Sequence, residues 1–213
     1  MTDLPVFTAA DGIASLILHE IPLRGEGYIL VRCVFGTLEG LLRECANFCR
    51  GAGAAQVYAG GEADFSGYPV FARLMERQLA LPQPPQTDCT VEAVTEENAS
   101  FWAERYNERF AAVPAAQSCG PYEAKRLAAG GECFFVCDNG MPVGLGRVRE
   151  TRLLALASLR PGAGEQTLFA LARHCGLHEL HLTCTVENTR AMAFYDRLGF
   201  SRGAITQQWH RIF

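Results

Sequence analysis

Three prolines stand within four residues of this 213-residue chain, at positions 82, 84 and 85. Each proline fixes its φ angle near about −65° and lacks an N–H group, so the stretch favours extended polyproline geometry over a helix or a sheet strand. We therefore predict a linker over residues 82–87 that separates an N-terminal domain, residues 1–81, from a longer domain, residues 88–213. A chain of this length has room for two small domains.

Charge and composition argue against several classes of function. The 23 acidic and 19 basic residues give a net charge of −4, and no run of Lys or Arg offers a basic surface for nucleic acid. No stretch approaches the roughly 18 apolar residues of a membrane span, and the opening residues do not resemble a signal peptide. We expect a cytoplasmic protein without nucleic-acid or membrane partners. Nine cysteines, with no Cys-x-x-Cys pair, indicate reduced and mostly buried thiols.

The first 81 residues predict a small α/β domain. Apolar runs, turn residues and a candidate N-cap at Thr37 define its elements. The expected strands cover 13–21, 28–35 and 55–59, with a hairpin turn at 22–27, and the expected helices cover 37–49 and 69–79.

The longer domain has better punctuated elements, because Gly and Asn residues mark most of their ends. The turn Asp138-Asn-Gly140 is a strong hairpin signal between two of the strands. Strands are expected at 90–94, 133–137, 143–149, 153–159, 180–185, 200–205 and 207–213, and helices at 96–110, 122–129, 165–175 and 189–198.

The segment 186–200 is the most informative part of the chain. Asn188 is a good N-cap, and Ala191, Phe194 and Leu198 recur at helical spacing, which predicts the buried stripe of a helix. Tyr195 falls on a second face of that helix. By spacing alone this describes an ordinary helix that carries a half-buried tyrosine.

A strand, then N-x-x-A-x-x-F-Y-x-x-L-G-F over residues 188–200, then two closing strands resembles the C-terminal end of the GNAT N-acetyltransferase superfamily. The element order over 88–213 is similar to that fold. The resemblance implies a mixed-sheet α/β fold, acetyl-CoA as co-substrate, no metal, and direct attack by an amine of a small molecule or a protein. The elements at 37–49, 55–59 and 69–79 echo the C-terminal half, which suggests a degenerate GNAT-like half before the main domain.

The resemblance also implies a pyrophosphate loop between a strand and a helix. Small residues let successive backbone N–H groups turn toward a phosphate at the positive end of the helix. Gly162, Ala163 and Gly164 would supply these groups, and Arg160 would supply a cation. The loop departs from the usual family pattern at three positions, namely Pro161, Glu165 and Gln166.

By the same resemblance, backbone N–H groups near Leu156 and Ser158 would polarise the thioester carbonyl. Tyr195 would protonate the departing thiolate, which suits a phenol that stays protonated at neutral pH. Asn188 would orient the cofactor or a bound water, or would serve as the N-cap alone. Glu150 is the first candidate for the base that accepts the amine proton.

Glu132 and Glu187 are the next candidates for that base, and each is also an ordinary surface acid. The cluster of His174, His178, His181 and two cysteines invites a zinc interpretation, but its members run from a helix end into a strand and point to opposite faces. We therefore expect no metal.

Two other classes of function stay open. The departures in the loop favour a catalytically inactive module that binds acyl-CoA and has a regulatory role, and a protein-interaction domain without a cofactor is the further alternative. The N-terminal part would wall the acceptor site or mediate formation of a homodimer.

Overall fold

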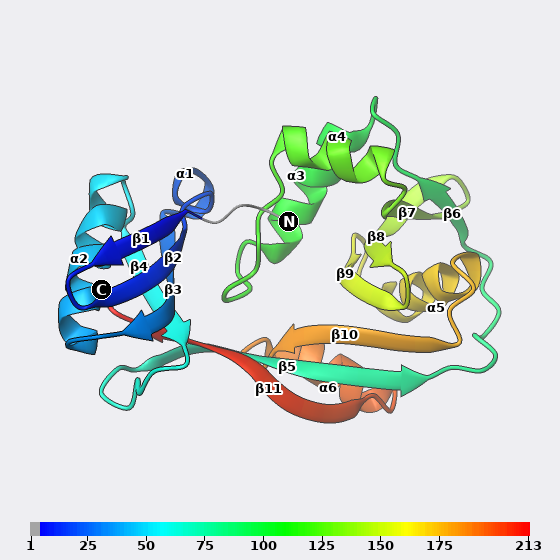
Figure 1. Cartoon of the computed structure of the whole chain (residues 1–213). Coiled ribbons are helices and arrows are strands. Elements are labelled where there is room, and N and C mark those ends of the chain that lie inside the picture. Colours follow the sequence, from blue (N-terminus) through cyan, green and yellow to red (C-terminus); the bar gives the residue numbers. More distant parts are fainter. Residues whose placement is uncertain (1–4) are drawn as a thin grey trace. The chain divides into compact units, whose positions relative to one another are not determined.

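The computed structural model describes residues 5–213 (Figure 1). The chain forms two compact units that are each discontinuous in sequence. Unit 1 contains the described residues up to 75 together with 185–187 and 205–213, and unit 2 contains 76–184 and 188–204. The units therefore do not divide at the Pro-rich segment, which lies inside unit 2. No helix in the described residues is long and apolar enough to cross a membrane.

Unit 1 begins with an antiparallel arrangement of β1, β2 and β3, followed by a parallel pairing of β3 with β4. The helix α2 connects the two parallel strands, and Thr37 caps it as predicted, since its side chain accepts a hydrogen bond from the Gly40 N–H at 3.1 Å. The elements are β1 (Val6–Ala9), β2 (Gly12–Ile17), α1 (Ile21–Arg24), β3 (Glu26–Val34), α2 (Leu38–Gly51) and β4 (Gln56–Gly61).

The core of unit 1 lies between α2 and the sheet. Leu41 and Leu42 of α2 pack in one buried cluster with Leu16, Ile29 and Val57 of three strands. The predicted turn at 22–27 contains the short helix α1, and β1 was missed because only four residues form it.

The segment predicted as a helix over 69–79 is instead the strand β5 (Val70–Ala80), so that prediction was wrong. The backbone of β5 and of the residue after it pairs with distant segments. The Val186 N–H donates to the Arg73 carbonyl at 2.8 Å, and the Leu81 N–H, directly after β5, donates to the His178 carbonyl at 2.7 Å. Of the three elements in the predicted echo of a GNAT-like half, the helix at 37–49 and the strand at 55–59 are present as α2 and β4, whereas the element at 69–79 is a strand and not a helix.

The two predicted closing strands, at 200–205 and 207–213, form a single strand, β11 (Ser201–Arg211). Figure 1 shows β5 and β11 running side by side. Each of these strands begins in one unit and ends in the other, because residues 70–75 and 205–211 belong to unit 1 and residues 76–80 and 201–204 to unit 2.

Within unit 2 the strand order is β11-β5-β10-β9-β8-β7-β6. The predicted hairpin around Asp138-Asn-Gly140 joins β7 and β8, and Asn139 and Gly140 have positive φ angles of 50° and 75°, as this turn requires. The remaining elements are β6 (Thr90–Ala93), α3 (Ala99–Phe110), α4 (Pro121–Ala129), β7 (Cys133–Asp138), β8 (Met141–Arg149), β9 (Arg152–Ser158), α5 (Gly164–His174), β10 (Glu179–Thr185) and α6 (Thr189–Arg197).

Two glycines of β8 fix how closely α5 approaches the sheet. A Cβ atom at Gly144 would lie 2.1 Å from Thr167 Oγ1, and one at Gly146 would lie 2.3 Å from the Leu171 side chain. The helices α3 and α4 pack in a separate buried cluster with Phe135 and Leu145. The helix α5 therefore packs on one face of the sheet of unit 2, and α3 and α4 pack on the other face.

Candidate acyl-transfer site

The parallel strands β9 and β10 are connected through α5 and pair only where they begin. The single register pair is His181 with Arg152, and the His181 N–H donates to the Thr151 carbonyl at 3.2 Å. In the described chain the ladder between them does not continue past this pair. The carboxyl-terminal halves of β9 and β10 are therefore not hydrogen-bonded to each other.

The register of β9 shows which of its N–H groups face that edge. The Leu159 N–H donates to the Val143 carbonyl at 2.8 Å, and the register then makes Ala157 and Leu145 the next hydrogen-bonded pair with β8. Leu156 and Ser158 alternate with these residues, so their N–H groups point away from β8. They face the side on which the pairing with β10 has ended.

The loop after β9 leads directly into α5. Gly162 has a φ angle of 81°, a conformation that glycine adopts without strain, and no protein atom lies within 4 Å of the position of a Cβ there. Ala163 is the buried N-cap residue, and its carbonyl accepts the N–H and hydroxyl of Thr167 at 2.9 and 2.6 Å. Gly164 is the first residue of α5, and a Cβ there would lie 3.3 Å from the Phe194 ring.

The first N–H groups of α5 are oriented to receive an anion. No side chain in the described chain caps this helix, so the N–H groups of its first turn remain available, and the helix dipole favours negative charge at this end. Two charged side chains, Glu165 and Arg160, change the electrostatic potential at this end of α5. Glu165 lies in the first turn, 3.9 Å from Arg197, and Arg160 pairs with Asp138 at 2.7 Å. The cation predicted for the loop is thus held by a carboxylate.

The buried face of α6 differs from the predicted one. Met192 and Tyr195 are buried, whereas Ala191, Phe194 and Leu198 are only half-buried, so the predicted stripe was wrong. The spacing of apolar residues in α6 fits two possible buried faces. Tertiary packing decides which of these faces contacts the strands, so the sequence alone could not show it.

Tyr195 lies within an aromatic cluster. Its ring centroid lies 5.1 Å from that of Phe200 and 5.2 Å from that of Phe194. Burial raises the pKa of the phenol well above its usual value, the nearby Cys184 raises it further, and the Arg77 charge lowers it. The group is therefore protonated at neutral pH, as a proton donor must be.

Arg77 of β5 is a residue of this region that sequence reasoning missed. Its side chain is fully buried and donates to the Asp196 carboxylate at 2.7 Å and to the Phe200 and Ser201 carbonyls at 2.8 and 2.7 Å. It also lies 3.6 Å from the Met192 sulfur. The sequence of β5 does not single it out, because the strand also contains Arg73, Glu76 and Gln78.

The remaining predicted residues fall in different places. Asn188 is the N-cap of α6, because its side chain accepts a hydrogen bond from the Ala191 N–H at 3.2 Å. Glu150 lies in the exposed turn between β8 and β9 with a φ angle of 54°. Glu187 accepts hydrogen bonds from the backbone and side chain of Arg73 in unit 1.

The third candidate base, Glu132, is held by two arginines. Burial by itself would raise its pKa, but hydrogen bonds from Arg149 at 2.7 Å and Arg147 at 2.9 Å outweigh burial and lower the pKa. A carboxylate stabilised in this way is a poor proton acceptor.

The histidines considered for zinc do not share a site. The His174 ring packs edge-on against Phe134 at 5.4 Å, and His181 contacts Glu179 at 3.2 Å. Within residues 5–213 no group of three or more His, Cys, Asp and Glu side chains is arranged to hold a metal.

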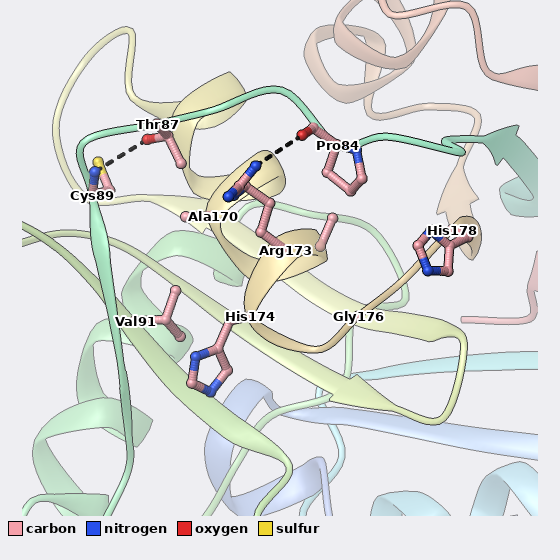
Figure 2. A pocket seen from close by; sticks show the side chains of 10 residues that line it. Pro84, Thr87, Cys89, Val91, Ala170, Arg173, His174, Gly176 and His178 are labelled. Atoms are coloured by element: carbon pink, nitrogen blue, oxygen red, sulfur yellow. Dashed lines mark hydrogen bonds between the residues drawn. The ribbon is translucent and has the colours of Figure 1, made fainter.

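The Pro-rich segment contacts α5 within unit 2. A cavity of about 410 Å³ is lined by residues of this segment, of β6 and of the C-terminal half of α5. Figure 2 shows the side chains that line it. Arg173 donates to the Pro84 carbonyl at 3.4 Å, and His178 Nδ1 lies 3.0 Å from the Pro82 carbonyl. These contacts make the segment a strap that is attached to unit 2.

The chain is similar in fold to several solved structures. A conserved protein of Staphylococcus epidermidis, described as functionally unknown, gives a TM-score of 0.58 at 14% identity over 99% of this chain and 94% of that one. GCN5-related N-acetyltransferases from Sphaerobacter thermophilus and Kribbella flavida give TM-scores of 0.53 and 0.52, each at 15% identity. They cover 94% and 98% of this chain and 76% and 89% of their own. At these identities the likeness defines the fold.

Residues 165–200, from the first turn of α5 to the end of the α6 motif, match the Acetyltransferase (GNAT) family. A search of curated proteins found no significant match. The fold and the family match together confirm the resemblance to the GNAT superfamily, and they support a general acyltransferase function.

Proposed function

We propose that this protein is an N-acetyltransferase that moves an acetyl group from acetyl-CoA to an amine of a small molecule or a protein. The proposal depends on the pairing of β9 with β10, which ends after the first residues of the two strands. The N–H groups of Leu156 and Ser158 are therefore unpaired by β10, and they precede the start of α5, which no side chain caps. Anion-binding groups thus follow directly after a pair of groups that can polarise a carbonyl.

The chain's own groups suit the steps of this reaction. The backbone of Gly162, Ala163 and Gly164 would hold the pyrophosphate of the co-substrate, and the N–H groups of Leu156 and Ser158 would stabilise the negative oxygen that forms on the thioester carbonyl. The amine nitrogen bonds to the carbonyl carbon, and the carbon–sulfur bond breaks.

The two protons of the reaction need a donor and an acceptor. Tyr195 would donate its phenol proton to the leaving thiolate, and its buried, protonated state supports that role. Glu150 would take the proton that the amine loses through water molecules, because it lies in the exposed turn before β9, at the end of that strand away from Leu156 and Ser158. Asn188 would act through the position of α6, which it caps.

The test compares Tyr195→Phe with Tyr122→Phe, a matched loss of one hydroxyl at a side chain that is 84% exposed on α4. We expect Tyr195→Phe to slow acetyl transfer about 100-fold without changing acetyl-CoA binding by calorimetry, and Tyr122→Phe to change neither. An unchanged rate in Tyr195→Phe removes that residue from its role. No binding of acetyl-CoA to the wild-type chain at millimolar concentration overturns the proposal.

A catalytically inactive acyl-CoA-binding module is the second candidate, favoured by the Arg160–Asp138 pair and by Glu165 at the start of α5. Tight binding of acetyl-CoA, with no acetyl transfer to a broad panel of amines and proteins, would support this candidate instead.

A further inference from the structure

A buried arginine of β5 lies against the helix that carries Tyr195. The side chain of Arg77 is fully buried, with 0% of it exposed. A guanidinium has five N–H donors and keeps its charge inside a protein. Burying such a charge costs free energy unless its partners are well placed. The partners of Arg77 therefore show which part of unit 2 this charge holds in place.

These partners lie at the end of α6 and directly after it. One terminal nitrogen, Nη2, donates to the Asp196 carboxylate at 2.7 Å and to the Phe200 carbonyl at 2.8 Å. The Nε–H of Arg77 donates to the Ser201 carbonyl at 2.7 Å, and Nη1 lies 3.6 Å from the Met192 sulfur. The planar guanidinium thus joins four groups that a single ammonium nitrogen could not reach together.

Tyr195 lies within the segment that these contacts fix. It precedes Asp196 in α6, and its carbonyl accepts a hydrogen bond from the Phe200 N–H at 3.0 Å. The Tyr195 ring packs edge-on against the Phe200 ring, with 5.1 Å between ring centroids. Because Arg77 fixes both Asp196 and Phe200, it also limits the positions that the Tyr195 ring can take.

The charge of Arg77 also acts on the phenol. Burial and the nearby Cys184 raise the pKa of Tyr195, whereas Arg77 lowers it. Arg77 and Arg202 both pair with the Asp196 carboxylate, so these three side chains together keep a positive charge. A cation beside a phenol stabilises the negative oxygen that forms when the phenol proton leaves.

We propose that Arg77 is a positioning residue for acetyl transfer: it fixes the turn of α6 that carries Tyr195 and stabilises the phenolate left when Tyr195 protonates the leaving thiolate. This inference rests on the function proposed above. In the step concerned, the carbon–sulfur bond breaks, the phenol proton passes to the sulfur, and the phenolate regains a proton from water before the next turnover. Arg77 is fully buried, so it acts through Tyr195 rather than on the co-substrate.

Arg77→Lys tests this role, because it keeps the charge and loses the contact with four groups. Release of the CoA thiol from acetyl-CoA is measured with a panel of amines as acceptors, and acetyl-CoA binding is measured by calorimetry. We expect kcat to fall about tenfold or more, while the KM and the binding of acetyl-CoA change less than about twofold. An unchanged kcat overturns the proposal, and so does a loss of acetyl-CoA binding that accounts for the whole loss of rate.

Arg126→Lys is the matched control. Arg126 also pairs with a carboxylate, that of Glu123 at 3.3 Å on α4, but both of these side chains are exposed. The same substitution there should change neither kcat nor KM. A similar fall in kcat in both variants would reflect a general effect of replacing arginine, and it would contradict the role of Arg77.

A double variant separates an action through Tyr195 from a purely structural one. In the Tyr195→Phe background no phenol proton is available, so the addition of Arg77→Lys should lower kcat less than about twofold further. If the two substitutions instead lower kcat by independent factors that multiply, Arg77 does not act through Tyr195.

Asp196→Glu protects the test against misfolding of Arg77→Lys. It keeps every charge, moves the carboxylate by one methylene group, and replaces a side chain that is 36% exposed. We expect it to lower kcat about threefold with KM unchanged, and an unchanged kcat overturns the proposal if Arg77→Lys does not fold. A wild-type chain that releases no thiol contradicts the proposed function itself, whereas a rate that depends on Tyr195 but not on Arg77 contradicts this inference alone.

Discussion

The guanidinium of Arg77 lies 2.7 Å from the carboxylate of Asp196, which connects the strand β5 to the last turn of α6. Arg77 comes before the Pro-rich segment and Asp196 lies near the end of the family motif. The same guanidinium donates to two backbone carbonyls just after α6, where the helix dipole also favours a positive charge. The position of α6, and with it that of Tyr195, therefore depends on a residue outside the segment that matches the family.

Replacing Arg77 is expected to destabilise the protein strongly. Arg77→Ala leaves the Phe200 and Ser201 carbonyls without their buried donor, and we expect a loss of about 3 kcal/mol in the free energy of unfolding by urea. Arg152→Ala is the control, because its contact with Glu76, at 3.5 Å between half-exposed side chains, contributes little. Equal losses in the two variants would contradict the role assigned to Arg77.

Asp196 is expected to make the stability depend on pH on the acid side. Hydrogen bonds from Arg202 and Arg77 lower the pKa of Asp196 to about 2. The folded state therefore holds fewer protons than the unfolded state, whose aspartate titrates near about 4. Its contribution is complete above pH of about 4 and disappears as the pH falls toward 2. Asp196→Asn should lower the melting temperature at pH 7 and much less at pH 2, where about half of the carboxylate is protonated.

The control for this experiment is Asp88→Asn, which removes an exposed carboxylate of unit 2. It should give the same melting temperature as the wild type at both values of pH. A loss in Asp196→Asn that is the same at pH 7 and pH 2 would show that packing rather than charge is responsible.

Gly144→Ala is expected to push α5 away from the sheet. The added Cβ would lie 2.1 Å from Thr167 Oγ1 and 2.8 Å from Thr167 Cβ, and overpacking of this kind costs about 1–3 kcal/mol of stability. Gly120→Ala, at a position with no protein atom within 4 Å of the Cβ and a φ angle of −76°, should be neutral. Urea unfolding of both variants checks the difference, and a neutral Gly144→Ala would contradict the close approach of α5.

Gly162→Asp is expected to weaken acetyl-CoA binding about tenfold or more, because it places a carboxylate in the loop assigned to the pyrophosphate. Gly176→Asp is a matched control at the other end of α5. Both glycines have positive φ angles, 81° and 64°, and neither has a protein atom within 4 Å of the Cβ position. Calorimetry with acetyl-CoA compares the two, and an equal effect would place the pyrophosphate elsewhere.

Local chemistry made parts of the fold predictable. The cap at Thr37 and the turn Asp138-Asn-Gly140 depend on hydrogen bonds and φ angles within a few residues, and both appear as predicted. The end of α6 follows from Gly199, whose φ angle of 82° allows the helix to stop.

The errors arose where distant segments decide the structure. In β5, Phe71, Leu74 and Met75 have a spacing that also fits a helix, and only pairing with strands more than 100 residues away selects the extended form. The wrong face of α6 has the same origin, since Met192 is buried by contact with Arg77. No local pattern in the sequence contains either pairing.

The candidate site was predictable only in part. Gly162, Ala163 and Gly164 do connect β9 to α5, because small residues after a strand indicate such a turn. That Arg160 is paired with Asp138, and that Glu150 lies in an exposed turn, depend on side-chain contacts that spacing does not encode. The roles of these residues in binding and catalysis stay predictions.

The division of β11 between the two units sets an order of events during protein synthesis. Residues 205–210, including His210, complete a cavity of unit 1, whereas most of that unit is translated much earlier. The nascent chain must therefore expose an incomplete unit 1 while the ribosome makes the whole of α3, α4, α5 and α6.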